Sequence, residues 1–297
     1  MSRAQGAVVV LAAGIVFSFG AVFFRWTDDI GAWEYLVFRA AGALAVTVPV
    51  FVFQNRRRVG VELQAVEFAH IGAGVIIGLM FSAFIVALTE TTAAFVLAFQ
   101  AGSPILAAIC SWFILRERMS REAQLATVGM ITGVVIMVSA GLGGAPLWIV
   151  PVVAIIPIGF GFYSTLIRVG DDIDPSVPVI VGATTALVIS LIATGLGDGF
   201  VASGHDRWIG FFAGVLLLGI PLPIFTWANR YVPAPDAALL LMSEVVLAPI
   251  WMWWIHAEEP SAETLIGGAV ILTSVVWLTV RAAGGMVRIL RSPRPVR

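Results

Sequence analysis

The chain has 297 residues, of which 60% are hydrophobic and 12% are charged, with a formal net charge of -1 and a mean hydropathy of +1.00. A soluble domain carries about 25% charged residues, so the composition excludes that class and predicts an all-α integral membrane protein. The expected partner is therefore the lipid bilayer, and no nucleic acid is expected. The single cysteine, Cys110, lies in an apolar run and excludes an internal disulfide.

Apolar runs of membrane-spanning length fill most of the chain. A span needs about 20 largely apolar residues, and charged or helix-breaking residues separate ten such runs. We expect transmembrane helices at residues 5–24, 33–53, 67–88, 93–115, 122–141, 147–169, 177–196, 208–230, 236–256 and 263–283.

The arginines predict the orientation, because loops rich in Lys and Arg stay in the cytoplasm. With the N-terminus inside, 14 arginines fall on the inner side, Arg25 and Arg207 fall on the outer side, and Arg39 lies within the second span. We therefore expect a multi-pass protein of the cell (cytoplasmic) membrane, with both termini cytoplasmic. The first span has no convincing small-residue cleavage site, so we expect it to be retained rather than cleaved as a signal peptide.

The two halves of the chain repeat each other at an offset of 141 to 143 residues. Identical residues at this offset include Phe17 and Phe160, Arg25 and Arg168, Asp28-Asp29-Ile30 and Asp171-Asp172-Ile173, Ala93 and Ala234, and Glu117 and Glu258, and Ser103 aligns with Glu244. Five spans per copy is an odd number, so the second copy must enter the membrane from the opposite face. We divide the chain into a five-helix repeat (1–145), a second, inverted five-helix repeat (146–285) and a basic cytoplasmic tail (286–297).

Two motifs give a family resemblance. Ser103-Pro104 leads to Leu115-Arg116-Glu117, and Ser243-Glu244 leads to Ala257-Glu258 and then to Gly267. From about residue 5 to 281, the chain resembles the ten-helix EamA-type members of the drug/metabolite transporter superfamily. It departs from the family at Val245, where proline is usual, and has Pro249 one turn later. The resemblance implies transport of small metabolites without an ATPase, often of amino acids or drugs.

Two charged residues within spans are candidates for substrate binding. A charge at mid-membrane costs about 2.5–3.5 kcal/mol on insertion scales and normally faces a protein interior or a wet cavity. Glu244 lies about 12 Å inside its helix end, so we expect it to carry a coupling proton or to pair with a substrate ammonium group; the alternative is a structural carboxylate. Arg39 could attract a substrate carboxylate or snorkel to the interface.

Polar residues that break the repeat are further candidates, because one substrate needs different groups from each half. Gln100 aligns with Leu241, and Tyr163 aligns with Gly20. The other predicted substrate-binding residues are Ser103, which shares a helical stripe with Gln100, and the aromatics Phe17, Phe81, Phe99, Trp227 and Trp251. Aromatic residues of this kind also serve as core, as lipid contacts or as an interfacial belt.

These features predict a secondary transporter that works by alternating access. One charge of each sign fits a zwitterion, so we expect an exporter of large apolar or aromatic amino acids; export of cationic drugs or polyamine-like compounds is the alternative. No nucleotide-binding, hydrolase or metal motif is present, so we expect no enzyme activity, cofactor or metal. A membrane-embedded enzyme or a channel are the rival classes. Monomer and homodimer both stay open.

Overall fold

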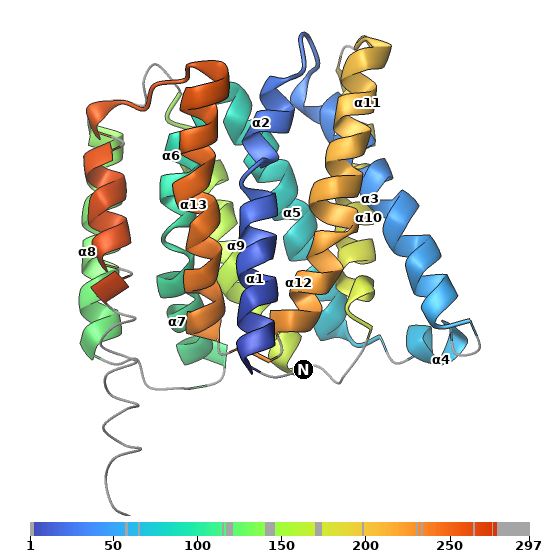
Figure 1. Ribbon diagram of the computed structural model, residues 1–297, viewed down its shortest axis with the longest axis horizontal. Helices are drawn as coiled ribbons and strands as arrows, with labels where there is room; N and C mark the ends of the chain where they lie inside the picture. The colour runs from blue at the N-terminus through green and yellow to red at the C-terminus, as the bar shows by residue number, and fades with distance from the viewer. Residues whose placement is uncertain are drawn as a thin grey trace, which may run out of the picture.

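Helices make up nearly all of the structure, because a backbone in lipid must satisfy its N–H and C=O groups within its own segment. The computed structural model describes residues 3–56, 59–64, 66–114, 116, 121–139, 146–169, 174–197, 199–229, 231–232, 234–263, 265–274 and 276–277. No strand occurs among these residues. The helices run side by side in one bundle (Figure 1).

The first half of the chain contributes eight helices to the described residues. They are α1 (Arg3–Phe17), α2 (Gly20–Arg25), α3 (Ala32–Gln54), α4 (Val59–Gln64), α5 (Phe68–Glu90), α6 (Ala93–Gln100), α7 (Ser103–Ile114) and α8 (Arg121–Ser139). The second half contributes α9 (Ile149–Val169), α10 (Ser176–Leu196), α11 (Gly204–Ala213), the π-helix η1 (Gly214–Gly219), α12 (Pro221–Asn229), α13 (Ala234–His256) and a shorter helix at Leu265–Ser274.

Seven segments of the described chain are helical, long and apolar enough to cross a membrane. They are Gln5–Arg25, Ala32–Gln54, Phe68–Glu90, Ala93–Ile114, Ile149–Ile167, Ser176–Leu196 and Gly204–Asn229. Shorter apolar helices occupy Gln124–Ile136, Leu240–His256 and Leu265–Ser274. Large apolar side chains such as Phe53, Phe113 and Leu196 are exposed on the structure, as lipid contact requires. The chain is thus a multi-pass membrane protein.

Helices of the two halves pack directly on one another. In the described chain α5 packs against α9 and α10, α3 packs against α10, α11 and η1, and α1 packs against α12 and α13. A side chain at Gly78 of α5 would collide with the backbone of Gly182 in α10, so this crossing requires glycine.

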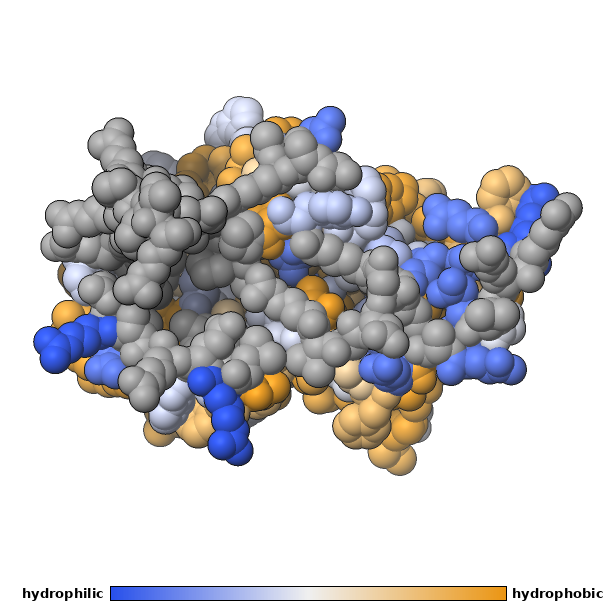
Figure 2. All heavy atoms as spheres, turned by 90° about the horizontal axis from the view of Figure 1, so that it is seen from below, coloured by the Kyte–Doolittle hydropathy of each residue, from blue (hydrophilic) through white to orange (hydrophobic). Residues whose placement is uncertain are grey.

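Seen from below, the end that carries the N-terminus shows hydrophilic residues among hydrophobic ones (Figure 2).

Several sequence predictions fall on residues that the structure does not describe. Glu117, the Asp171-Asp172-Ile173 match, the tail from 286 and the last part of the 263–283 segment lie outside the described residues. The short helix α4 was not predicted, and α13 runs through Pro249 without ending there. Three predicted spans differ from continuous α-helices at the places described next.

Candidate functional site

A cavity of about 120 Å³ lies where helices of both halves meet. Its wall is mainly aromatic and aliphatic, with a few polar side chains, as is typical of small-molecule sites. The lining residues are Phe17, Gly20, Arg39, Ile77, Met80, Phe81, Phe84, Gln100, Ser103, Ile156, Phe160, Tyr163, Leu217, Leu218, Leu222, Phe225, Leu241 and Glu244.

The predicted span at 93–115 is interrupted beside this cavity. α6 ends at Gln100 and α7 begins at Ser103, because Pro104 has no N–H to donate to the Gln100 carbonyl four residues earlier. The Ser103 hydroxyl donates to that carbonyl instead, at 2.5 Å. The interruption therefore leaves Gln100 and Ser103 next to each other on the cavity wall.

Two more segments depart from the α-helix at the cavity. α1 ends at Phe17 and α2 begins at Gly20, and the hydroxyl of the intervening Ser18 donates to the Ile15 carbonyl at 2.6 Å. The π-helix η1 places Leu217 on the wall. Discontinuous helices surround the binding sites of many transporters, and π-turns are frequent at functional sites.

Glu244 lies on the cavity wall, ten residues or about 15 Å along α13 from its first residue. Its residue surface is 9% exposed, and its Oε2 accepts a hydrogen bond of 2.9 Å from Nε2 of Gln100. The bond joins α13 of the second half to α6 of the first. A neutral amide thus occupies a position from which a substrate ammonium group could bind the carboxylate.

Arg39, a residue of opposite charge to Glu244, is buried at the wall of the same cavity. Its residue surface is 5% exposed, and its Nε and Nη1 have no hydrogen-bond partner within the described structure. The guanidinium carbon lies 5.5 Å from the centroid of the Phe81 ring, within the range of a cation–π contact. A side chain at Gly214 of η1 would overlap the Arg39 carbonyl. Close packing of α3 on η1 therefore fixes the position of the Arg39 backbone.

A buried cation with unpaired donors is costly, because each unmade hydrogen bond to a charged group loses about 1.5–3 kcal/mol. Arg39 and Glu244 both line the cavity, but in the part of the chain that the structure describes they form no ion pair with each other. The cavity therefore offers a cationic group with two unsatisfied donors and a carboxylate held by an amide. A ligand with an anionic and a cationic end would satisfy both.

Two more contacts, one within the second half and one between the halves, shape the rest of the wall. The hydroxyl groups of Tyr163 in α9 and Thr226 in α12 lie 2.8 Å apart. The rings of Phe17 and Phe225 meet edge to face at 6.0 Å. These contacts orient a tyrosine and two phenylalanines around the cavity.

The comparisons with known proteins decide the family. The model of the EamA-like transporter family matches the chain twice, at residues 4–139 and 147–280. The chain belongs to the EamA-like transporter family. This finding confirms the resemblance to the drug/metabolite transporter superfamily. The cavity just described is thus the cavity of a transporter-family protein.

Two similar proteins extend the comparison. Human solute carrier family 35 member G1 is 24% identical over 303 residues, which cover 93% of this chain and 79% of that protein. A protein of known crystal structure superposes on this chain with a TM-score of 0.66 at 18% sequence identity. The superposition covers 95% of this chain and 99% of the other. This structural likeness shows a shared fold.

The structure brings seven of the ten predicted site residues of this EamA-like transporter together. Those on the cavity wall are Phe17, Arg39, Phe81, Gln100, Ser103, Tyr163 and Glu244. The other three lie outside the lining. Phe99 is buried against Phe95, Trp227 is 40% exposed with its ring against Tyr231, and Trp251 stacks on Phe19 beyond the cavity.

Much of the apolar wall could not be predicted from the sequence. Met80, Leu217 and Leu222 line the cavity, but nothing distinguishes them from the many other apolar residues of the spans. Their position depends on how the helices cross and on the π-turn of η1. A break in the repeat at a polar residue was the informative signal, as at Gln100 and Tyr163.

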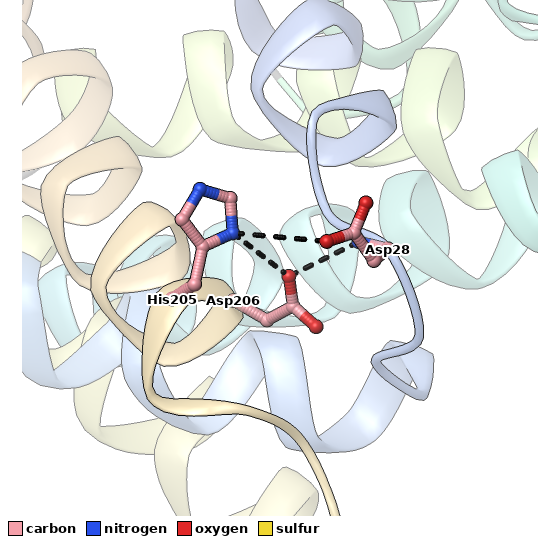
Figure 3. Close-up of side chains that lie close together, drawn as sticks. All are labelled: Asp28, His205 and Asp206. Carbon is pink, nitrogen blue, oxygen red and sulfur yellow. Dashed lines mark hydrogen bonds and ion pairs between the residues drawn. The ribbon is translucent and has the colours of Figure 1, made fainter.

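Three side chains of the types that bind metal ions, Asp28, His205 and Asp206, lie close together near the start of α11, away from the cavity. Nδ1 of His205 is 3.5 Å from Asp206 and 4.0 Å from Asp28 (Figure 3). The buried Asp206 carboxylate accepts the backbone N–H groups of Asp28 at 3.0 Å and Asp29 at 3.3 Å. These hydrogen bonds tie the loop after α2 to α11, so the cluster serves as a joint between the halves. The sequence spacing of the histidines did not predict this proximity.

Proposed function

We propose that this EamA-like transporter is a secondary transporter that exports amino acids with large apolar or aromatic side chains by alternating access across the cytoplasmic membrane. The observation that carries the proposal is the unpaired, buried guanidinium of Arg39 in the same cavity as Glu244. A zwitterion supplies one partner for each charge.

The proposed binding mode uses the unsatisfied groups of the cavity. The substrate carboxylate pairs with the guanidinium of Arg39, whose Nε and Nη1 have no hydrogen-bond partner in the described structure. The substrate ammonium group donates to Glu244 and displaces Nε2 of Gln100 from it. Charge-assisted hydrogen bonds of this type are about twice as strong as neutral ones, so exchange of the amide for the ammonium favours binding.

The apolar part of the substrate has an aromatic wall to pack against. Phe17, Phe81, Phe160 and Phe225 all line the cavity. Aromatic rings prefer edge-to-face or offset contacts with other rings, each adding about 0.5–1.5 kcal/mol. This wall supports a preference for substrates with large apolar or aromatic side chains.

Alternating access is supported by the duplication of the chain. The family model matches each half separately, and the shorter apolar helices at Gln124–Ile136, Leu240–His256 and Leu265–Ser274 fall within the three predicted spans that the seven long segments leave out. We therefore propose ten spans in two inverted repeats, with both termini cytoplasmic. Inverted repeats place the substrate site between the halves and give two related conformations.

Export of cationic drugs or polyamine-like compounds is the second candidate. It would use the carboxylate of Glu244 but would leave the unpaired cation of Arg39 in the same cavity. Like charges in a buried site repel, so this observation favours the zwitterion.

Enzyme chemistry has less support, because the cavity lining contains no histidine or cysteine and the Ser103 hydroxyl donates to a carbonyl. A channel would favour a continuous polar stripe, which this mainly apolar lining lacks.

Binding of three probes to the purified protein tests the site chemistry. Phenylalanine carries both charges, phenylethylamine lacks the carboxylate, and 3-phenylpropionate lacks the ammonium group. We expect phenylalanine to bind roughly tenfold or more tightly than either analogue, since each lost charged hydrogen bond costs about 1.5–3 kcal/mol. If phenylethylamine binds as tightly as phenylalanine, the cationic alternative replaces the zwitterion.

A further inference from the structure

Three segments far apart in sequence meet at the end of the bundle opposite to the N-terminus (Figure 1). Arg25 is the last residue of α2, Glu258 follows α13, and Thr91 lies between α5 and α6. Nε of Arg25 donates to Oε2 of Glu258 at 3.1 Å, and Nη2 of Arg25 donates to the Thr91 carbonyl at 3.2 Å. One arginine therefore joins all three segments.

The second oxygen of Glu258 is also occupied. Oε1 accepts the backbone N–H of Ala93, the first residue of α6, at 2.7 Å. A carboxylate at a helix N-terminus satisfies an orphan donor and interacts favourably with the helix dipole. The Glu258 and Arg25 side chains are only 17% and 30% exposed, so water screens this contact less than it screens a surface ion pair.

A stacked aromatic pair lies between this contact and the cavity residue Glu244 along α13. Trp251 lies seven residues beyond Glu244 in α13, and Glu258 lies seven residues further. The Trp251 ring stacks on Phe19 with a centroid distance of 5.4 Å and an interplanar angle of 14°. Nε1 of Trp251 donates to the Ser18 hydroxyl at 3.0 Å, at the interruption between α1 and α2. Along α13, the Trp251–Phe19 stack thus lies between Glu244 on the cavity wall and Glu258 of the ion pair.

The sequence carries the residues of this contact twice. Arg25, Ala93 and Glu258 match Arg168, Ala234 and Glu117 in the other half. The backbone repeats as well: Arg116 and Ala257, which directly precede the two glutamates, both have a φ of 53°. Non-glycine residues in this left-handed region cost about 1–3 kcal/mol and persist only where the surroundings demand them. Glu117 and the side chains of Arg168 and Ala234 lie outside the described residues.

We propose that Arg25, Glu258, the Thr91 carbonyl and the Ala93 N–H form a latch, the Glu258 latch, which closes the cavity at this end and opens in each transport cycle. The latch rests on the proposed alternating-access function. Inverted repeats exchange the environments of their two ends between conformations, and a motif present in both halves fits a contact that forms at one end at a time.

Cross-linking tests whether the latch must open. In a Cys110→Ala background, Arg25→Cys and Glu258→Cys are joined with a short bifunctional thiol reagent in proteoliposomes. We expect transport to fall in proportion to the cross-linked fraction, and a reagent that modifies one thiol only to have a smaller effect. Undiminished transport by the cross-linked protein overturns the proposal.

A second ion pair at the same end provides the matched control. Arg207 contacts Glu34 at 3.2 Å, but this pair joins α3 to α11, whose crossing is so close that a side chain at Gly42 would overlap the Phe211 carbonyl. These two helices cannot separate without losing that packing. Cross-linking Glu34→Cys to Arg207→Cys should therefore leave transport intact; equal loss at both pairs also overturns the latch.

A labelling experiment needs no substrate, so it separates failure of the latch from failure of the proposed function. Glu258→Gln keeps an acceptor for Ala93 but removes the charge that attracts Arg25. A single cysteine at position 84, from Phe84→Cys on the cavity wall, should then react roughly tenfold faster with a membrane-impermeant maleimide added on the latch side. The exposed Glu259→Gln is the control. Equal labelling rates in the two variants contradict the latch, whatever the probes of the cavity bind.

Discussion

Replacement of Glu244 by glutamine removes the charge of the cavity carboxylate with little change of shape. The Gln side chain retains a carbonyl oxygen for Nε2 of Gln100, which donates to Glu244 at 2.9 Å. A neutral hydrogen bond contributes about 0.5–1.5 kcal/mol and a charged one about 1.5–3 kcal/mol. We therefore expect Glu244→Gln to fold and to lose only about 1 kcal/mol from this contact.

The same substitution has a larger effect on the substrate. An ammonium group bound to a buried carboxylate loses a charged hydrogen bond of about 1.5–3 kcal/mol, which weakens phenylalanine binding by roughly 10- to 150-fold. Equilibrium binding of phenylalanine and of 3-phenylpropionate gives the comparison, because the acid has no ammonium group and should lose no affinity. The exposed Glu259→Gln is the matched control. Unchanged phenylalanine affinity together with an unchanged pH profile of transport would show that Glu244 is structural.

Three further substitutions test the surroundings of the cavity. Arg39→Gln removes unpaired buried donors, so we expect a higher thermal midpoint without substrate and a loss of phenylalanine binding that phenylethylamine does not share; parallel losses for both ligands would contradict the carboxylate role. Gly214→Ala collides with the Arg39 carbonyl, whereas a side chain at Gly204 meets no atom within 4 Å. Size-exclusion chromatography should therefore show poor folding of Gly214→Ala only. Gln100→Leu leaves the cavity carboxylate without its amide donor, at a cost of about 1–3 kcal/mol; its thermal midpoint should fall, unlike that of the exposed Gln124→Leu.

The sequence predicted the helical segments because length and hydropathy alone define a span. It also predicted which buried charges deserve functional tests, since Arg39 and Glu244 each interrupt an apolar run at a cost. Polar residues that break the repeat, such as Gln100 and Tyr163, proved to lie on the same cavity wall. These signals lie within single spans or in the comparison of the two halves, so the sequence of one chain is enough to find them.

Other features depend on packing between segments. Pro104 accounts for the break between α6 and α7, but the interruption at Ser18 and the π-turn of η1 have no comparable signal. Trp251 shares a helix face with Glu244, yet its stacking on Phe19 and its bond to Ser18 hold it outside the lining. The direction in which a side chain turns above a cavity depends on the partner helix, which periodicity does not reveal.

Counterflow in proteoliposomes tests the central claim, transport of a zwitterion through this cavity, most directly. Vesicles are loaded with unlabelled phenylalanine and diluted into a trace of labelled phenylalanine, and the label inside is followed with time. For the native protein we expect a saturable, transient accumulation that competing large apolar amino acids suppress, and a much smaller accumulation for Glu244→Gln at the same concentration. No accumulation of any amino acid by the folded native protein, or equal accumulation by the two proteins, would contradict the account.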